Sequence, residues 1–164
     1  MTSNRVGDVV LSTGLLDHLL EQYPTATATV ACGPSAVSLF RACNRVDQIV
    51  KLQKMRYAGH WVRLWAQSVG TFWNIVVDLR ASALSWTIPH ARHFIFKSTN
   101  EPIHRIVSLG NVLGLSEPPV PRVWLEEADV VRARQLIPHG PVLALGPTAN
   151  WGGKRWPASS FLEL

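Results

Sequence analysis

Segments with strand-like and helix-like patterns alternate along this 164-residue chain. The clearest strand covers residues 73–79, a nearly continuous apolar run of the kind found in parallel sheets. Apolar residues at helical spacing predict helices over 9–22, 59–69, 103–113 and 126–136, and a short helix that ends near Cys43. Shorter strands are predicted over 27–32, 48–52 and 93–96. This alternation predicts an α/β fold with a Rossmann-like, doubly wound parallel sheet.

A proline-rich connector at residues 118–121 divides the sequence into a first domain over 1–120 and a second that begins at 121 and covers 121–164. The first strand of the second part is predicted over 142–146, and it continues through a loop into an apolar helical start at Ala158. At the other end, only Met1–Asn4 precede a loop of the type that joins a first strand to its helix. The first strand is therefore either very short or incomplete in this sequence.

The overall composition excludes several classes of protein. The net charge of +5 comes from scattered basic residues, and no helix-turn-helix, zinc-finger or RNA-binding pattern accompanies it, so we expect no nucleic-acid partner. No apolar run approaches the roughly 20 residues of a membrane span, and no signal-peptide pattern opens the chain, which predicts a cytoplasmic protein. Cys32 and Cys43 lack metal or redox spacing and are expected to be buried, reduced thiols.

The loop after the predicted strand over 142–146 is a candidate phosphate site. Its small residues would let the backbone approach an anion, the following helix offers free N–H groups, and a lysine adds positive charge. The spacing is not that of a Walker loop, because Arg155 follows the lysine. A solvated surface loop is the alternative. The candidate donor-binding residues are Thr148, Asn150, Gly153 and Lys154.

Gly7 and Asp8 lie where the first helix is expected to begin. An aspartate at this position commonly caps the helix N-terminus, and the spacing alone favours that interpretation. The alternative is a carboxylate at the carboxyl edge of a parallel sheet, where α/β proteins bind ligands and where it could accept a proton from a substrate hydroxyl.

Two further groups of candidate site residues follow predicted strands. Arg80 comes directly after the buried strand over 73–79 and could bind an anionic acceptor, although a structural pair with Asp78 is equally compatible with the sequence. His104 and Arg105 open a helix after Pro102, where polar residues are common. No residue pattern indicates a metal site or a Ser-His-Asp or Cys-His arrangement.

Four motifs together resemble the family 9 glycosyltransferases, the group of ADP-heptose:lipopolysaccharide heptosyltransferases. Arg5-Val-Gly-Asp-Val-Val-Leu-Ser-Thr-Gly-Leu-Leu16 is similar to the family's opening motif, and Lys154-Arg-Trp-Pro157 is similar to its lysine-x-Trp-Pro segment. The stretch from Ile75 to Ala83 and the His104-Arg105 pair fall between them in the family's order. The resemblance covers nearly the whole chain.

The resemblance implies a GT-B architecture with two Rossmann-like domains, of which this sequence would contain the N-terminal half plus the first strand and loop of the second domain. It implies transfer of heptose from ADP-heptose to a sugar hydroxyl of a lipopolysaccharide precursor, with inversion, and with neither metal nor cofactor. Asp8 would be the general base, and Lys154 would bind the donor diphosphate. Gly7, Arg80, His104 and Arg105 would lie on the acceptor side.

Family members continue for about another domain beyond the position of Leu164 and carry there a second nucleotide-binding motif. We therefore expect the 164-residue chain to be a fragment with little transferase activity of its own. Its lipid-linked acceptor implies contact with the anionic cytoplasmic face of the inner membrane. The alternative function is a non-catalytic α/β module that binds a nucleotide or another protein.

Overall fold

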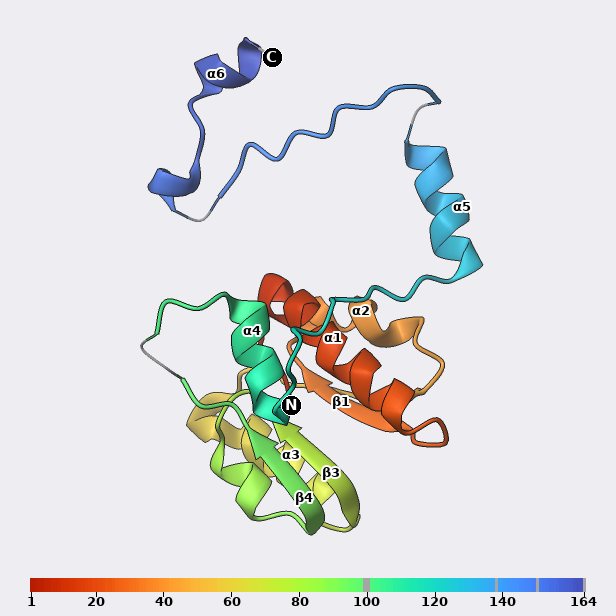
Figure 1. Cartoon of the computed structure of the whole chain (residues 1–164), viewed down its shortest axis with the longest axis vertical. Helices are drawn as coiled ribbons and strands as arrows, with labels where there is room; N and C mark the ends of the chain where they lie inside the picture. Colours follow the sequence, from red (N-terminus) through yellow and green to blue (C-terminus); the bar gives the residue numbers. More distant parts are fainter. Residues whose placement is uncertain (99–100, 138, 150, 164) are drawn as a thin grey trace. The chain divides into compact units, whose positions relative to one another are not determined.

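The computed structural model describes residues 1–98, 101–137, 139–149 and 151–163, and Figure 1 shows it in full. The chain divides into two compact units, Met1–Glu126 and Glu127–Leu164. All strands of the described part lie in the first unit. The first unit is therefore where the predicted α/β sheet is found.

Four strands form two parallel pairs in the first unit. β1 (Ala28–Cys32) pairs with β2 (Val46–Lys51), and β3 (Trp73–Asp78) pairs with β4 (His90–Ile95). The helices that connect or follow them are α1 (Val6–Gln22), α2 (Ser38–Arg41), α3 (Gly59–Ser68) and α4 (Arg105–Gly110). Short 3-10 turns are η1 (Pro34–Ala36), η2 (Arg56–Ala58), η3 (Ala83–Trp86) and η4 (Asn111–Leu113).

The first three residues join the two strand pairs. The Thr2 N–H donates to the Ala31 carbonyl at 2.9 Å, which ties the segment to β1. On its other side, the Leu79 N–H donates to the Met1 carbonyl at 2.9 Å, and the Met1 amino group donates to the Val77 carbonyl at 2.6 Å. The strand order across the unit is thus β2, β1, Met1–Ser3, β3, β4. This order places a three-residue segment at the centre of the doubly wound arrangement.

Helices cover both faces of the strands, and alternation along β1 shows why. Val30 and Cys32 pack with Val9 of α1 and Phe40 of α2, whereas Ala31, which points the opposite way, packs with Leu64 of α3. All these side chains are buried. α4 packs beside α1, as Figure 1 shows. The two apolar clusters are the core of a sheet with helices on both sides, which confirms the predicted fold class.

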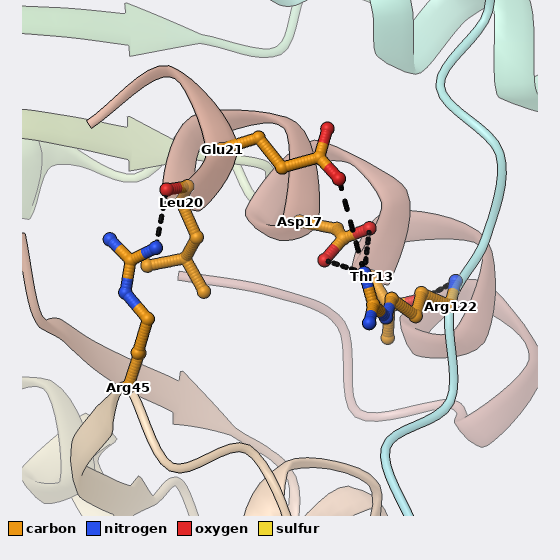
Figure 2. Close-up of polar contacts among 6 residues, drawn as sticks. All are labelled: Thr13, Asp17, Leu20, Glu21, Arg45 and Arg122. Atoms are coloured by element: carbon orange, nitrogen blue, oxygen red, sulfur yellow. Dashed lines mark hydrogen bonds and ion pairs between the residues drawn. The ribbon is translucent and has the colours of Figure 1, made fainter. Parts of the chain in front are cut away.

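Arg45 closes the end of α1. Its guanidinium donates to the carbonyls of Leu20, Tyr23 and Ala26, and the Leu20 bond is drawn in Figure 2. The last carbonyls of a helix have no partner within the helix, and a cation there also complements the helix dipole. Arg45 thus provides hydrogen-bond donors for carbonyls at the C-terminal end of α1. In the sequence, only Pro24 indicates that the helix ends there.

Residues 119–124, which overlap the connector predicted over 118–121, form a strap across α1. The Arg122 N–H donates to Thr13 Oγ1 at 2.9 Å, and the Arg122 guanidinium lies 3.1 Å from the Asp17 carboxylate (Figure 2). A Cβ at Gly14 would lie 2.6 Å from the Val120 carbonyl oxygen, so only glycine allows the strap to approach this closely. The first unit extends to Glu126 because this segment packs on its surface.

The second unit contains α5 (Glu127–Leu136), η5 (Gly152–Lys154) and α6 (Ala158–Leu162). The strand predicted over 142–146 is not formed, and this part of the prediction was wrong. A strand needs a neighbour to satisfy its backbone groups, and no strand lies in the described part of this unit. Val142, Leu143 and Leu145 are half or more exposed as a result.

Candidate functional site

Asp8 lies in the first turn of α1, at the carboxyl edge of the sheet. The helix begins at Val6 with Arg5 as its N-cap, and no side chain caps it. The expectation that Asp8 itself is the N-cap was therefore wrong, because the helix starts before it. The Ser3 hydroxyl donates to Asp8 Oδ2 at 3.2 Å and accepts the Arg5 N–H at 3.2 Å. Asp8 is half-buried and is oriented by Ser3 rather than used as a cap.

Gly7 borders open space beside this carboxylate. It is exposed, and a Cβ built on it would have no heavy atom within 4 Å. Nothing in the packing requires glycine at this helical position. The first turn of α1 is therefore open to solvent at Gly7.

The side chain of Arg80 also contacts this edge, at the turn that follows Met1–Ser3. The Arg80 guanidinium donates to the Asn4 side-chain oxygen at 2.9 Å, and Asn4 packs so closely on Gly33 that a Cβ there would lie 2.7 Å from the Asn4 Cα. The same guanidinium stacks 5.0 Å above the Trp61 ring. Arg80 and Asp8 thus both contact the Ser3–Asn4 turn, which brings two of the predicted site residues to one edge of the sheet.

Asp78 fixes the loop that carries Arg80. Its fully buried carboxylate accepts the Arg80 N–H at 2.9 Å, the Ser82 N–H at 2.7 Å and the Ser82 hydroxyl at 2.7 Å. Between them Ala81 has a φ of 51°, in the left-handed region that L residues rarely adopt. The Asp78–Arg80 relation that the sequence suggested is therefore a backbone contact, and it leaves the Arg80 side chain directed to Asn4 and Trp61. A strained loop held by three hydrogen bonds is a pattern found at binding sites.

His104 and Arg105 have different surroundings. The His104 Nδ1 accepts the Ile106 N–H at 3.3 Å, so this side chain caps α4. The Arg105 guanidinium stacks 4.1 Å from the Phe96 ring, and the Phe96 N–H donates to the Asp78 carbonyl at 2.9 Å. Arg105 therefore lies at the carboxyl end of β4, on the same edge as Asp78, whereas the polar contacts of His104 are within α4.

The predicted donor-binding residues belong to the second unit. Thr148, Gly153 and Lys154 are exposed, and Asn150 lies outside the described residues. Lys154 ends the η5 turn, where its N–H donates to the Trp151 carbonyl at 3.0 Å. A Cβ at Gly153 would lie 2.9 Å from the Trp151 ring, which explains glycine at that position. The loop is thus a turn closed on Trp151, without the supporting strand that was predicted.

Burial shifts the pKa of two groups beside the site. Burial lowers the pKa of the Met1 amino group below its ordinary 8.0, and the nearby Asp78 carboxylate opposes this shift. Burial also raises the pKa of the Cys32 thiol above its ordinary 9.0, which favours the protonated form. Cys32 and Cys43 are both free and buried, as predicted.

Sequence reasoning missed several residues of this edge. Ser3 orients Asp8, Asn4 holds Arg80, and Trp61 supports the Arg80 guanidinium from α3. Ser3 and Asn4 are small polar residues directly before the Arg5–Asp8 motif, and this position could have indicated that they orient the site residues. From the sequence, Trp61 is identified only as lying within the helix predicted over 59–69.

Comparison with known proteins supports the fold. The crystal structure of the glycosyl transferase family 9 from Veillonella parvula DSM 2008 matches with a TM-score of 0.77 at 19% sequence identity. The match covers 98% of this chain and 56% of that one. The chain therefore shares the α/β fold of that part of a GT-B glycosyltransferase.

The other comparisons found no counterpart. No family model matches the sequence, and no curated protein matches it.

Within the described residues, no helix is long and apolar enough to cross a membrane. No group of three or more metal-ligating His, Cys, Asp or Glu residues occurs in the same part of the chain.

Proposed function

We propose that this chain forms the acceptor side of a family 9 glycosyltransferase and the start of its donor side. One observation carries the proposal: Asp8 is bonded to Ser3 and Arg80 to the adjacent Asn4, at the carboxyl edge of a sheet that shares its fold with a family 9 enzyme. Ligands of doubly wound proteins bind at this edge.

The reaction would be the inverting transfer of a heptose from ADP-heptose to a sugar hydroxyl of a lipopolysaccharide precursor. Asp8 would accept the proton of the attacking hydroxyl, and the Ser3 hydroxyl would keep the carboxylate pointed toward it. Arg80, with Gly7, His104 and Arg105, would bind the acceptor. Thr148, Asn150, Gly153 and Lys154 would bind the donor diphosphate, where a lysine stabilises the negative charge that develops on the leaving group. The acceptor would be met at the cytoplasmic face of the inner membrane.

An assembled donor side is needed for this activity. In the second unit, the loop before Lys154 lacks its strand, and the described residues of that unit are not buried. We therefore expect the purified 164-residue chain to transfer little or no sugar from ADP-heptose. The alternative function, a non-catalytic nucleotide-binding or interaction module, is favoured for the isolated chain by the same observation.

The test uses residues 1–126 joined to the remaining part of the Veillonella parvula protein. In this protein Asp8→Asn should lower kcat by about 10²–10⁴, the usual contribution of a general base, and should leave ADP affinity unchanged. Asp47→Asn is the matched control, because Asp47 is an exposed carboxylate on β2 whose partners are the hydroxyls of Thr27 and Thr29. Full activity of Asp8→Asn would remove Asp8 as the base.

A further inference from the structure

Two histidines of β4 contact each other directly. His93 Nδ1 and His90 Nε2 lie 2.6 Å apart, and the two rings are nearly perpendicular, with centroids 4.5 Å apart. Residues three positions apart in a strand point to opposite faces of the sheet, so regular strand geometry would separate these side chains. A specific arrangement of the first residues of β4 therefore brings the two rings together.

The Ile88 carbonyl fixes the ring of His90. Its oxygen lies 2.8 Å from His90 Nδ1. Because a carbonyl oxygen only accepts hydrogen bonds, Nδ1 carries the proton, and in the neutral ring the lone pair is on Nε2, which faces His93. Histidines that ligate metal ions have this arrangement, in which one ring nitrogen donates to a carbonyl or carboxylate and the other binds the ion.

His93 offers the second nitrogen at a place that solvent reaches. With His90 Nε2 as the acceptor, His93 Nδ1 carries the proton and His93 Nε2 holds the lone pair. Both histidines are half-buried, and the Trp86 ring, which meets the His93 ring edge-on at a centroid distance of 4.4 Å, is 67% exposed. Among the described strands, β4 pairs only with β3, so it lies at an edge of the sheet.

We propose that His90 Nε2 and His93 Nδ1 bind one divalent transition-metal ion of the class that prefers imidazole ligands, for which Zn²⁺ is the probe. The ion takes the place of the proton between the two nitrogens, and His93 holds its proton on Nε2 instead. Two nitrogens bound to a tetrahedral Zn²⁺ ion lie about 3.3 Å apart, so the rings separate by roughly 0.7 Å from their 2.6 Å contact.

Water completes the coordination of this ion. Within the residues that the structure describes, no third His, Cys, Asp or Glu side chain joins the pair. Two imidazoles with water suit a borderline ion such as Zn²⁺, whereas Mg²⁺ and Ca²⁺ prefer oxygen ligands. The site should therefore select transition-metal ions over Mg²⁺.

The site lies apart from the residues proposed for sugar transfer. His90 pairs with Trp73, the first residue of β3, whereas Ile95 pairs with Asp78 at the carboxyl edge of the sheet. At about 3.3 Å per residue, His90 is roughly 17 Å along the strand from that edge. The ion is thus proposed independently of the transfer reaction.

NMR of the histidine rings in the ¹⁵N-labelled 164-residue chain tests the site. Without ZnCl₂, both rings should carry their proton on Nδ1. On addition of ZnCl₂, we expect His93 to change to the tautomer with the proton on Nε2, while His90 keeps its Nδ1 proton on the Ile88 carbonyl. The exposed His139 should keep its tautomer, and MgCl₂ should leave all of these rings unchanged. This measurement needs no variant and therefore does not depend on whether a variant folds.

Matched variants locate the binding by calorimetry. His90→Gln and His93→Gln should each weaken Zn²⁺ binding at least about tenfold, because each removes one of the two imidazoles. His139→Gln, at an exposed histidine of the second unit, should change the affinity less than twofold. Cu²⁺ should quench the fluorescence of the chain less in Trp86→Phe than in the original chain, since Trp86 lies against the His93 ring.

Three results would overturn the site. They are an unchanged His93 tautomer at millimolar ZnCl₂, equal losses of Zn²⁺ affinity in His93→Gln and His139→Gln, and binding of Mg²⁺ as tight as that of Zn²⁺. The first of these would mean that the two histidines only form a hydrogen bond within the fold. Sugar transfer enters none of these measurements, so their outcome leaves the proposed function untouched.

Discussion

The two units of this chain contain similar apolar residues but differ in what those residues contact. In Met1–Glu126, two clusters of buried side chains pack on the two faces of the strands. In the described part of Glu127–Leu164, no residue is buried, and Leu143, Trp151 and Leu162 are each more than 60% exposed. The difference shows that an apolar pattern becomes a strand only where neighbouring strands are present to pair with it.

The same difference separates the candidate site residues of the first unit from those of the second. Asp8 and Arg80 are held by Ser3, Asn4 and the Asp78 loop, all of which belong to a packed unit. Lys154 stands at the end of a single turn closed on Trp151. Precise chemistry requires side chains positioned by a rigid scaffold, and in the described residues only the candidates of the first unit have one.

The largest expected effect compares two leucines. Leu52→Ala should lower the free energy of unfolding by about 2–5 kcal/mol, because Leu52 is 2% exposed and lies in the core beside α3. Leu143→Ala, at a side chain that is 69% exposed, should change it by less than about 0.5 kcal/mol. Urea denaturation measures both. Equal losses would mean that the second unit has a core of its own.

The second largest expected effect is the loss of stability when the buried Asp78 carboxylate is replaced. Asp78→Asn should cost about 2–3 kcal/mol, because an amide cannot accept all three hydrogen bonds that the buried carboxylate accepts. Asp47→Asn, on exposed β2 surface, should be nearly neutral. Thermal unfolding followed by circular dichroism compares the two variants. A neutral Asp78→Asn would show that the loop carrying Arg80 does not depend on this carboxylate.

Two glycines of α1 should respond in opposite directions. Gly14→Ala should destabilise the first unit by about 1–3 kcal/mol, because its Cβ would meet the carbonyls of Pro119 and Val120 in the strap. Gly7→Ala should be stabilising by up to about 1 kcal/mol, since its Cβ meets nothing and alanine favours a helix. Chemical denaturation of the pair measures both signs. Two stabilised variants would mean that the strap does not lie on α1.

The smallest effect is a dependence on pH. Burial lowers the pKa of the Met1 amino group in the folded chain, so below its ordinary value of 8.0 the unfolded chain binds the proton more readily. The stability of the 164-residue chain should therefore fall as the pH drops below 8, by at most about 1.4 kcal/mol per pH unit from this group. N-terminal acetylation removes the group and serves as the control. Identical pH profiles for the acetylated and free chains would show that the amino group is not buried.

Much of the first unit could be predicted from the sequence. The buried run over 73–79 and the apolar periodicity of α1 and α3 reflect local packing on a sheet, and the structure places all three elements within a few residues of prediction. The prediction of a strand over 142–146 was wrong because an apolar run forms a strand only beside a neighbouring strand. A local sequence pattern does not show whether such a neighbour is present.

The candidate site was predicted less completely than the fold. Arg80 was recognisable because it directly follows a strand-like segment, and Asp8 because it lies where the first helix was expected to begin. Their partners were not, because the contacts of Asn4 with Arg80 join residues 76 positions apart in the sequence, and the strap reaches Thr13 from Arg122 across 109 positions. Such contacts depend on the whole sheet being formed.

Amide hydrogen exchange on the 164-residue chain tests the contrast between the two units most directly. The amides of Thr2 and Leu79, which bond across the centre of the sheet, should be protected to nearly the full free energy of unfolding. Those of Val142, Leu143 and Leu145 should exchange almost as fast as in an unfolded peptide. Protection of residues 142–145 equal to that of β3 would contradict the account, because it would place a paired strand directly before the Lys154 loop.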